Sequence, residues 1–219
     1  FQGEYERGRQ EYLKAALGSQ DIEIQASAML GIGRAYFEEY NYTQAVETFK
    51  SLINEHPANQ SLANAYYFLA ESYMQQQMPA EAAEAYAKYL ELKPGVLDDI
   101  IQKRRAEALM AAGNYTGAIE AYQAAITAGS DRGQALIKIG QAYAALSDFS
   151  NAVKTYLEAY NSTDNEYIKA QANLLSGQIY MELGFPEQAY ARYQDSISNF
   201  QHAYDSYTGL VTLVNDGIP

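Results

Sequence analysis

The residues that could perform acid–base or metal chemistry are few and scattered in this chain. His56 and His202 are the only two histidines, cysteine is absent, and the carboxylates are spread along the sequence. A metal site or a nucleophilic triad needs a histidine beside partners that the fold holds in place. The Walker A, dinucleotide-binding and HExxH motifs do not occur. The sequence therefore predicts no catalytic residue, no metal and no cofactor, and any enzymatic activity is expected in a domain outside this chain.

Charge limits the classes of partner. The 219 residues include 15 Lys and Arg against 27 Asp and Glu, which gives a formal net charge of −12. Binding to nucleic acid by counterion release needs a basic face, and a membrane span needs an apolar run of about 20 residues. We therefore expect no nucleic acid partner and no membrane insertion within this chain. An acidic protein attracts basic partners at long range, so a protein or extended peptide of basic or mixed charge is favoured.

Small and aromatic residues recur in register every 34 to 37 residues, and they reveal the elements that position everything else. The second-helix small column is Gly8, Ala45, Ala82, Ala118, Ala152 and Ala189, and the aromatic column four residues later is Tyr12, Phe49, Tyr86, Tyr122, Tyr156 and Tyr193. The first-helix small column, twelve residues earlier, is Gly33, Ala70, Ala106, Gly140 and Gly177. Apolar spacings of three and four predict two amphipathic helices per copy. We expect the small residues where helix axes approach closely, with the aromatic filling the adjoining space.

The pattern resembles the tetratricopeptide repeat family, whose consensus is matched best at Gly33, Tyr36, Ala45, Phe49 and Pro57. The resemblance implies an all-α, right-handed superhelical solenoid of antiparallel helix pairs, here a single domain excised from a larger protein. The expected organisation is the second helix of a preceding repeat over 1–19, whole repeats over 25–58, 62–95, 98–131, 132–165 and 168–202, and the first helix of a following repeat over 203–219.

The same resemblance implies a non-catalytic scaffold that binds a protein or peptide in the concave groove lined by the first helices. The candidate groove residues are Leu30, Arg34, Phe37, Tyr67, Glu71, Met74, Lys103, Glu107, Met110, Ile137, Gln141, Leu174, Gln178 and Met181. Three of them are Met in one column, which suits a surface that adapts to its partner. Two alternatives remain: this Met column packs between neighbouring first helices, or the convex face is the interface.

A second class of function stays open beside the binding scaffold. The Tyr-, Gln- and Ala-rich, Cys-free composition is similar to that of bacterial envelope proteins and favours an extracytoplasmic location over a cytoplasmic one. The alternative is therefore a helical superhelix domain that supports the separate catalytic domain of a cell-wall lytic transglycosylase, or an envelope assembly lipoprotein.

Incomplete repeats at the two ends are expected to leave apolar side chains without a neighbouring helix. Self-association through such uncapped ends is a further partner prediction. The basic triplet Lys103-Arg104-Arg105 is expected on a solvated helix face, with contact to an acidic ligand as the alternative. The end residues expected to be exposed are Tyr12, Leu13, Leu210, Val211 and Leu213.

Overall fold

The computed structural model describes residues 2–200 and 202–215, and the elements in this part of the chain are twelve α-helices. The helices divide into two compact units, an N-terminal unit of residues 1–114 and a C-terminal unit of residues 115–219. The boundary falls inside the predicted third repeat. Residues 1, 201 and 216–219, which include the end of the last predicted half repeat, lie outside the described residues.

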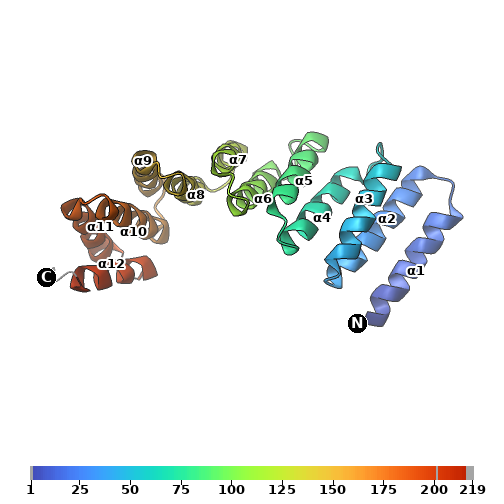
Figure 1. The fold of residues 1–219 in the computed structure, drawn as a ribbon, viewed down its shortest axis with the longest axis horizontal. Helices are drawn as coiled ribbons and strands as arrows, with labels where there is room; N and C mark the ends of the chain where they lie inside the picture. The colour runs from blue at the N-terminus through green and yellow to red at the C-terminus, as the bar shows by residue number, and fades with distance from the viewer. Residues whose placement is uncertain (1, 201, 216–219) are drawn as a thin grey trace. The chain divides into compact units, whose positions relative to one another are not determined.

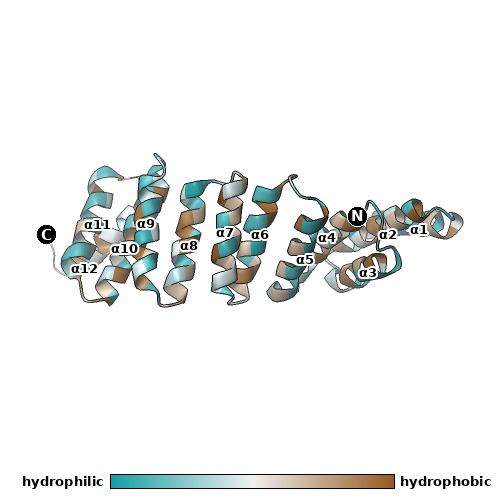
Figure 2. Cartoon of the chain, turned by 90° about the horizontal axis from the view of Figure 1, so that it is seen from above, coloured by the Kyte–Doolittle hydropathy of each residue, from teal (hydrophilic) through white to brown (hydrophobic). Residues whose placement is uncertain are grey.

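The N-terminal unit is a row of helices in which each packs against the next along the chain, and α2 also contacts α4 (Figure 1). Polar and apolar faces alternate around these helices (Figure 2), as the helical spacing predicts. The helices are α1 (Gln2–Gly18), α2 (Ile22–Glu38), α3 (Tyr42–Glu55), α4 (Leu62–Gln75), α5 (Pro79–Leu92) and α6 (Asp98–Ala111).

The C-terminal unit repeats this arrangement, with α8 also contacting α10 and α10 also contacting α12. Its helices are α7 (Tyr115–Ala128), α8 (Arg132–Ala145), α9 (Phe149–Asn161), α10 (Glu166–Glu182), α11 (Pro186–Asn199) and α12 (Tyr204–Asn215). The predicted fold class, an all-α array of helix pairs of the tetratricopeptide kind, is confirmed.

The small and aromatic columns form the core of both units. The second-helix small column is fully buried from Ala45 to Ala189, and the aromatic column is at most 2% exposed from Phe49 to Tyr193. A Cβ placed on Gly33 would lie 2.3 Å from the Phe49 ring, and one on Gly140 would lie 2.3 Å from the Tyr156 ring. The close helix approach predicted at these columns is therefore confirmed.

The turns between first and second helices share one backbone feature. At each of them a residue five positions before the second-helix small column adopts a left-handed conformation, and only two of these residues are glycine. Asn41 and Asp148 then cap α3 and α9 with their side chains, while Pro79 and Pro186 occupy the first turns of α5 and α11. The left-handed residues are Tyr40, Gln77, Gly113, Ser147 and Gly184.

The apolar ends match the prediction except at one residue. Tyr12 and Leu13 are 45% and 49% exposed, and Leu210 and Val211 are each 40% exposed. Leu213 is only 4% exposed, so its predicted exposure is wrong. The reason is that α12 packs against α10 and α11, which places Leu213 in a cluster with buried residues of both helices.

Candidate functional site

The predicted groove residues on α2, α4 and α6 form a surface that we call the N-terminal first-helix face. All nine keep accessible surface in the structure. Arg34, Lys103 and Glu107 are exposed. The other six are partly buried, and they are Leu30, Phe37, Tyr67, Glu71, Met74 and Met110.

Phe68 on α4 anchors an aromatic cluster beneath this face. Its ring centre lies 5.8 Å from that of Phe37 and 5.2 Å from that of Tyr67, both edge to face. The Arg34 guanidinium lies 5.1 Å from the Phe68 ring centre, within the range of a cation–π contact. The packing therefore holds Phe37 and Arg34 in fixed positions beside each other at the surface.

Glu71 is the centre of a polar cluster on the same face. Its Oε1 accepts a hydrogen bond from the Tyr86 hydroxyl and lies 2.7 Å from a guanidinium nitrogen of Arg104. Burial and the Glu71 carboxylate raise the pKa of Tyr86 well above its usual range, so Tyr86 stays a hydrogen-bond donor. Burial, and then Glu71, also raise the pKa of Tyr67. Glu71 is therefore an anion that the protein already neutralises.

The basic triplet on α6 does not form one solvated patch, and this expectation needs correction. Arg104 pairs with Glu71 and also lies 5.9 Å from the Tyr67 ring centre. Arg105 is partly buried, and its Nε has no hydrogen-bond partner among the described residues. Only Lys103 is exposed, and no ion pair of the described chain involves it. Lys103 is therefore the residue of the triplet that is exposed and has no ion pair among the described residues.

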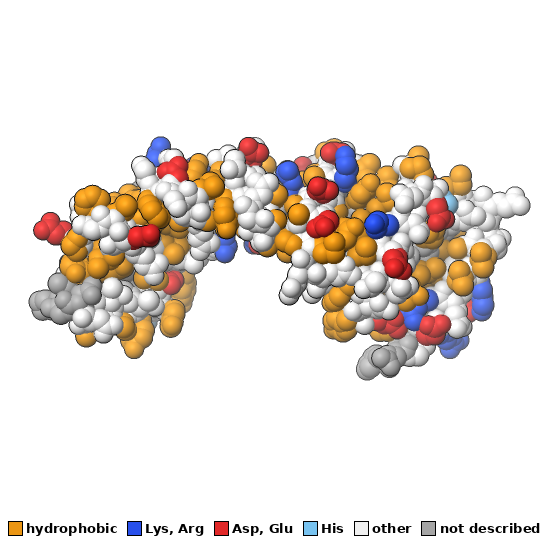
Figure 3. Space-filling model, in the orientation of Figure 1, with side chains coloured by type: hydrophobic (Ala, Val, Ile, Leu, Met, Phe, Trp, Pro, Cys, Tyr) orange, Lys and Arg blue, Asp and Glu red, His pale blue; other side chains and the backbone are white. Residues whose placement is uncertain are grey.

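Arg104 and Tyr86 are the residues of this polar cluster that are absent from the groove candidates. The Glu71–Arg104 separation of 33 residues is close to one repeat. A search for opposite charges about one repeat apart would have found it. The face drawn in Figure 3 shows charged side chains of both signs interspersed with hydrophobic ones on the helices of the N-terminal unit.

The predicted residues on α8 and α10 behave differently from those of the N-terminal unit. Ile137 is completely buried and Leu174 is 8% exposed, so neither offers surface to a partner in this structure. Leu174 packs in a cluster with Leu213 of α12, and Met181 of the Met column packs against the same cluster. Gln141 and Met181 are partly buried, while Gln178 is exposed.

A hollow of 340 Å³ lies between α8 and α10 on this side of the C-terminal unit. Gln178, Ala144 and Glu182 contribute to its lining, together with Phe149 at the start of α9. One of these residues, Gln178, belongs to the stripe of predicted groove residues on the first helices. The hollow therefore gives part of this stripe a concave setting.

No metal-binding or membrane-spanning element is found in the described part of the chain. Residues 2–200 and 202–215 contain no group of three or more His, Asp or Glu side chains placed to hold a metal ion. None of the helices in these ranges combines the length and apolar character that crossing a bilayer requires. His56 is partly buried and His202 is exposed, and they lie in different units.

Comparison with protein families decides the classification. Three profiles described as tetratricopeptide repeat match residues 27–59, 63–96 and 103–167, which together make up more than half of the chain. The chain belongs to the tetratricopeptide repeat family. No curated protein sequence matches it significantly.

Solved tetratricopeptide repeat structures share the fold at low sequence identity. YrrB, described as a tetratricopeptide repeat protein with an unusual peptide-binding site, is 17% identical, with 90% of this chain and 96% of YrrB covered and a TM-score of 0.64. MamA from Desulfovibrio magneticus RS-1 is 15% identical, with 79% and 93% covered and a TM-score of 0.60. BtubC from P. vanneervenii is 15% identical, with 90% and 88% covered and a TM-score of 0.57. At these identities the likeness establishes the fold alone.

Proposed function

We propose that this tetratricopeptide repeat chain is a non-catalytic binding module whose N-terminal first-helix face holds an extended peptide of a partner protein. The supporting observation is that all nine predicted residues on α2, α4 and α6 keep accessible surface above a packed aromatic and ion-paired base. Tetratricopeptide repeats generally mediate protein binding, and YrrB is described as having a peptide-binding site.

The chemistry of this face favours a peptide with both apolar and charged side chains. Phe37, Met74 and Met110 supply apolar surface, and flexible Met adapts to varied shapes. Lys103 and Glu107 are exposed one turn apart on α6, so each sign of charge on a peptide finds a counterpart. Because Arg104 already neutralises Glu71, this face is not strongly acidic, although the chain has a formal net charge of −12. A segment of mixed or basic charge fits these features.

The C-terminal unit contributes fewer candidate contact residues to the proposal. Gln141, Gln178 and Met181 remain candidate contacts because they keep accessible surface. Ile137 and Leu174 are left out because they are buried.

The test begins with a peptide selected from a random library on the wild-type protein, whose affinity is then measured by titration calorimetry. The variant Tyr67→Ala/Met110→Ala should bind at least about tenfold more weakly, because truncating central anchors commonly costs about 2 kcal/mol. Tyr67 also contacts buried rings, so Lys103→Glu/Met110→Ala serves as a second variant that leaves the aromatic cluster intact.

The matched control is Lys88→Ala on α5, because Lys88 is exposed and pairs only with Glu91 of its own helix. Its affinity should equal that of the wild type. The proposal is wrong if both face variants keep wild-type affinity with helical content intact, or if Lys88→Ala alone removes binding.

The alternative of a domain that supports a lytic transglycosylase, or of an envelope lipoprotein, remains a prediction from sequence. None of the matches described above points to either, and they give no support for an envelope location. Self-association through exposed end residues also remains a prediction; Leu17 at 79% exposure and Val214 at 64% are the most exposed aliphatic side chains among the described residues.

A further inference from the structure

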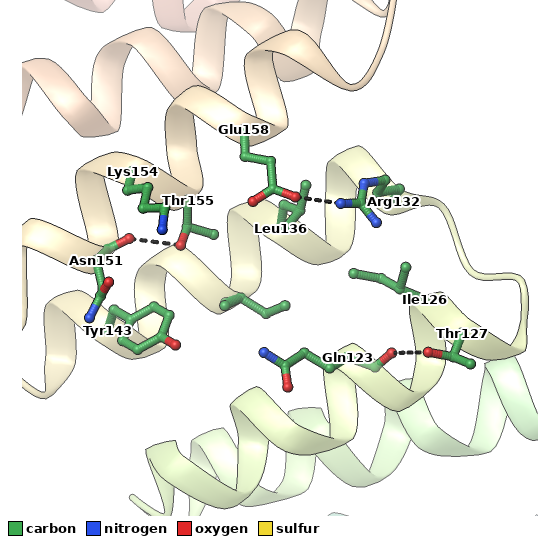
Figure 4. Close-up of a pocket in the computed structure, with 11 residues that line it drawn as sticks. Gln123, Ile126, Thr127, Arg132, Leu136, Tyr143, Asn151, Lys154, Thr155 and Glu158 are labelled. Carbon is green, nitrogen blue, oxygen red and sulfur yellow. Dashed lines mark hydrogen bonds and ion pairs between the residues drawn. The ribbon is translucent and has the colours of Figure 1, made fainter.

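The C-terminal unit carries a groove on the side of α8 opposite to the predicted stripe. A hollow of 360 Å³ lies between the second helices α7 and α9, with α8 as its floor (Figure 4). Its floor is apolar: Ile126 is partly exposed, and Leu136 and Ile139 beneath it are buried, at 5% and 3% exposure. Its volume falls in the range of pockets that hold small ligands. We call this hollow the α7–α9 groove.

The charges of the α7–α9 groove leave one cation available. Arg132 forms an ion pair with Glu158 at one end. Lys154 is exposed, and no ion pair or hydrogen bond of its amine occurs among the described residues, so Glu158 does not neutralise it. Figure 4 shows the side chains of Lys154 and Gln123 extending into the space between α7 and α9. An uncompensated ammonium and an amide donor therefore face a hollow with an apolar base.

The N-terminal unit has a groove at the same repeat positions, and its charge is reversed. A hollow of 520 Å³ lies between α1 and α3 over α2 and is lined by Glu47 and Glu55 with Leu13 and Leu17. Both grooves use the same offsets from the second-helix small column. Lys154, Glu158, Gln123 and Thr127 of the α7–α9 groove correspond to Glu47, Ser51, Leu13 and Leu17 of this one.

We propose that the α7–α9 groove binds an extended peptide segment of a partner protein that presents an aspartate or glutamate to Lys154. Charge complementarity within the groove carries the proposal, because Lys154 is exposed without an ion pair among the described residues, while Arg132 and Glu158 of the lining pair with each other. Ile126 contacts a neighbouring aliphatic side chain of the peptide, and the Gln123 amide donates a hydrogen bond to the carboxylate or backbone of the peptide. An equivalent segment is disfavoured between α1 and α3, where Glu47 repels the carboxylate.

This site is separate from the proposed peptide-binding face. Leu136 and Ile139 line the α7–α9 groove, whereas Gln141 belongs to the stripe on the other side of α8. Either binding site can therefore be present without the other. The test measures shifts of backbone amides, which show at which of the two sites a peptide binds.

The probes are three acetylated hexapeptides that differ only in two central residues: Ser-Leu-Asp-Asp-Leu-Ser, the same peptide with two Asn, and the same peptide with two Lys. Each is titrated into the ¹⁵N-labelled full chain, and amide shifts are followed by NMR. The Asp peptide should shift amides of α7 and α9 around Ile126 and Thr155, and its affinity should fall with added salt. The Asn peptide should bind about two- to fivefold more weakly, and the Lys peptide more weakly still.

Variants at the two equivalent positions complete the test. Lys154→Gln should weaken the Asp peptide about two- to fivefold and Lys154→Glu more, while Lys154→Arg should retain binding. Glu47→Lys in the N-terminal unit is the matched control and should leave the shifts around Lys154 unchanged. Three results overturn the proposal: equal affinity of the Asp and Asn peptides, shifts confined to the first-helix stripe, or no binding of the Asp peptide up to millimolar concentration.

Discussion

The two units have the same core and different surfaces. The buried columns repeat without exception from Phe49 in one unit to Tyr193 in the other. Three residues before the first-helix small column, however, Leu30 and Tyr67 are partly exposed, whereas Ile137 and Leu174 are buried. The repeat pattern therefore determines how the two helices of one pair pack together. It does not determine how much of the first helix is buried by the next helix pair.

The grooves between second helices extend this contrast to charge. Lys154 in one groove stands where Glu47 stands in the other, although the apolar floor of α8 and that of α2 occupy the same positions. Glu47 and Lys154 are both exposed, so the charge at this position can differ without changing the core. The two units therefore share one fold but differ in the charge of exposed residues between the buried columns, and these residues give their grooves different binding properties.

The largest expected effect tests whether the cores of the two units are equivalent. Gly33→Leu and Gly140→Leu should each cost about 3 kcal/mol, because even the first carbon of the new side chain lies 2.3 Å from a buried ring. Calorimetric unfolding of each variant measures this cost.

Gly8→Leu is the control, since a Cβ there meets nothing within 4 Å and the gain in helix propensity is the same. The two cores are not equivalent if one of the two core variants has the same melting temperature as the control. In that unit the two helices would then not pack closely at the glycine.

The columns were predictable from sequence because one glycine and one aromatic ring meet within a single helix pair. Their contact depends only on the spacing inside the repeat, so Gly33 and Phe49 could be paired in advance. The burial of Leu174 could not, because it depends on how closely α12 packs. The Glu71–Arg104 pair was missed for a related reason, since it joins neighbouring repeats and Arg104 lies outside the predicted stripe.

A smaller effect on stability is expected at high pH, where the buried tyrosines of the two units should differ in the pH at which they ionise. Burial raises the pKa of Tyr156 to about 12, whereas an unfolded tyrosine has its ordinary value near 10. As pH rises from 10 to 12, the unfolded chain loses this proton first, so the free energy of unfolding falls by about 2 kcal/mol. Denaturant titrations at each pH should show this loss, and Tyr156→Phe should remove its share.

Tyr86 sharpens the contrast because Glu71 adds a hydrogen bond and a negative charge to the effect of burial. Glu71→Gln keeps an acceptor oxygen but removes the charge, so Tyr86 should then ionise at lower pH, as measured by tyrosinate absorbance. An unchanged alkaline titration in this variant contradicts the Glu71 contact.

The smallest expected effect concerns the turn that both units share. Gln77 in the N-terminal unit and Ser147 in the C-terminal unit both have a φ of 59°, whereas Gly184 occupies the equivalent position with a φ of 77°. A left-handed backbone costs a residue with a Cβ about 1 kcal/mol, and the extra freedom of glycine in the unfolded chain offsets part of the gain. Gln77→Gly and Ser147→Gly should each stabilise the chain by about 0.5 kcal/mol.

Gly184→Ala should have the opposite sign and cost about 1 kcal/mol. Since a Cβ at Gly184 meets nothing within 4 Å, this cost comes from the backbone alone. The control is Glu84→Gly, an exposed position in the middle of α5 where glycine should destabilise the helix by about 1 kcal/mol. Thermal unfolding of the four variants measures these changes in stability. If Gln77→Gly loses as much stability as Glu84→Gly, then the side chain of Gln77 outweighs its backbone strain, and the turns of the two units are equivalent in shape but not in energy.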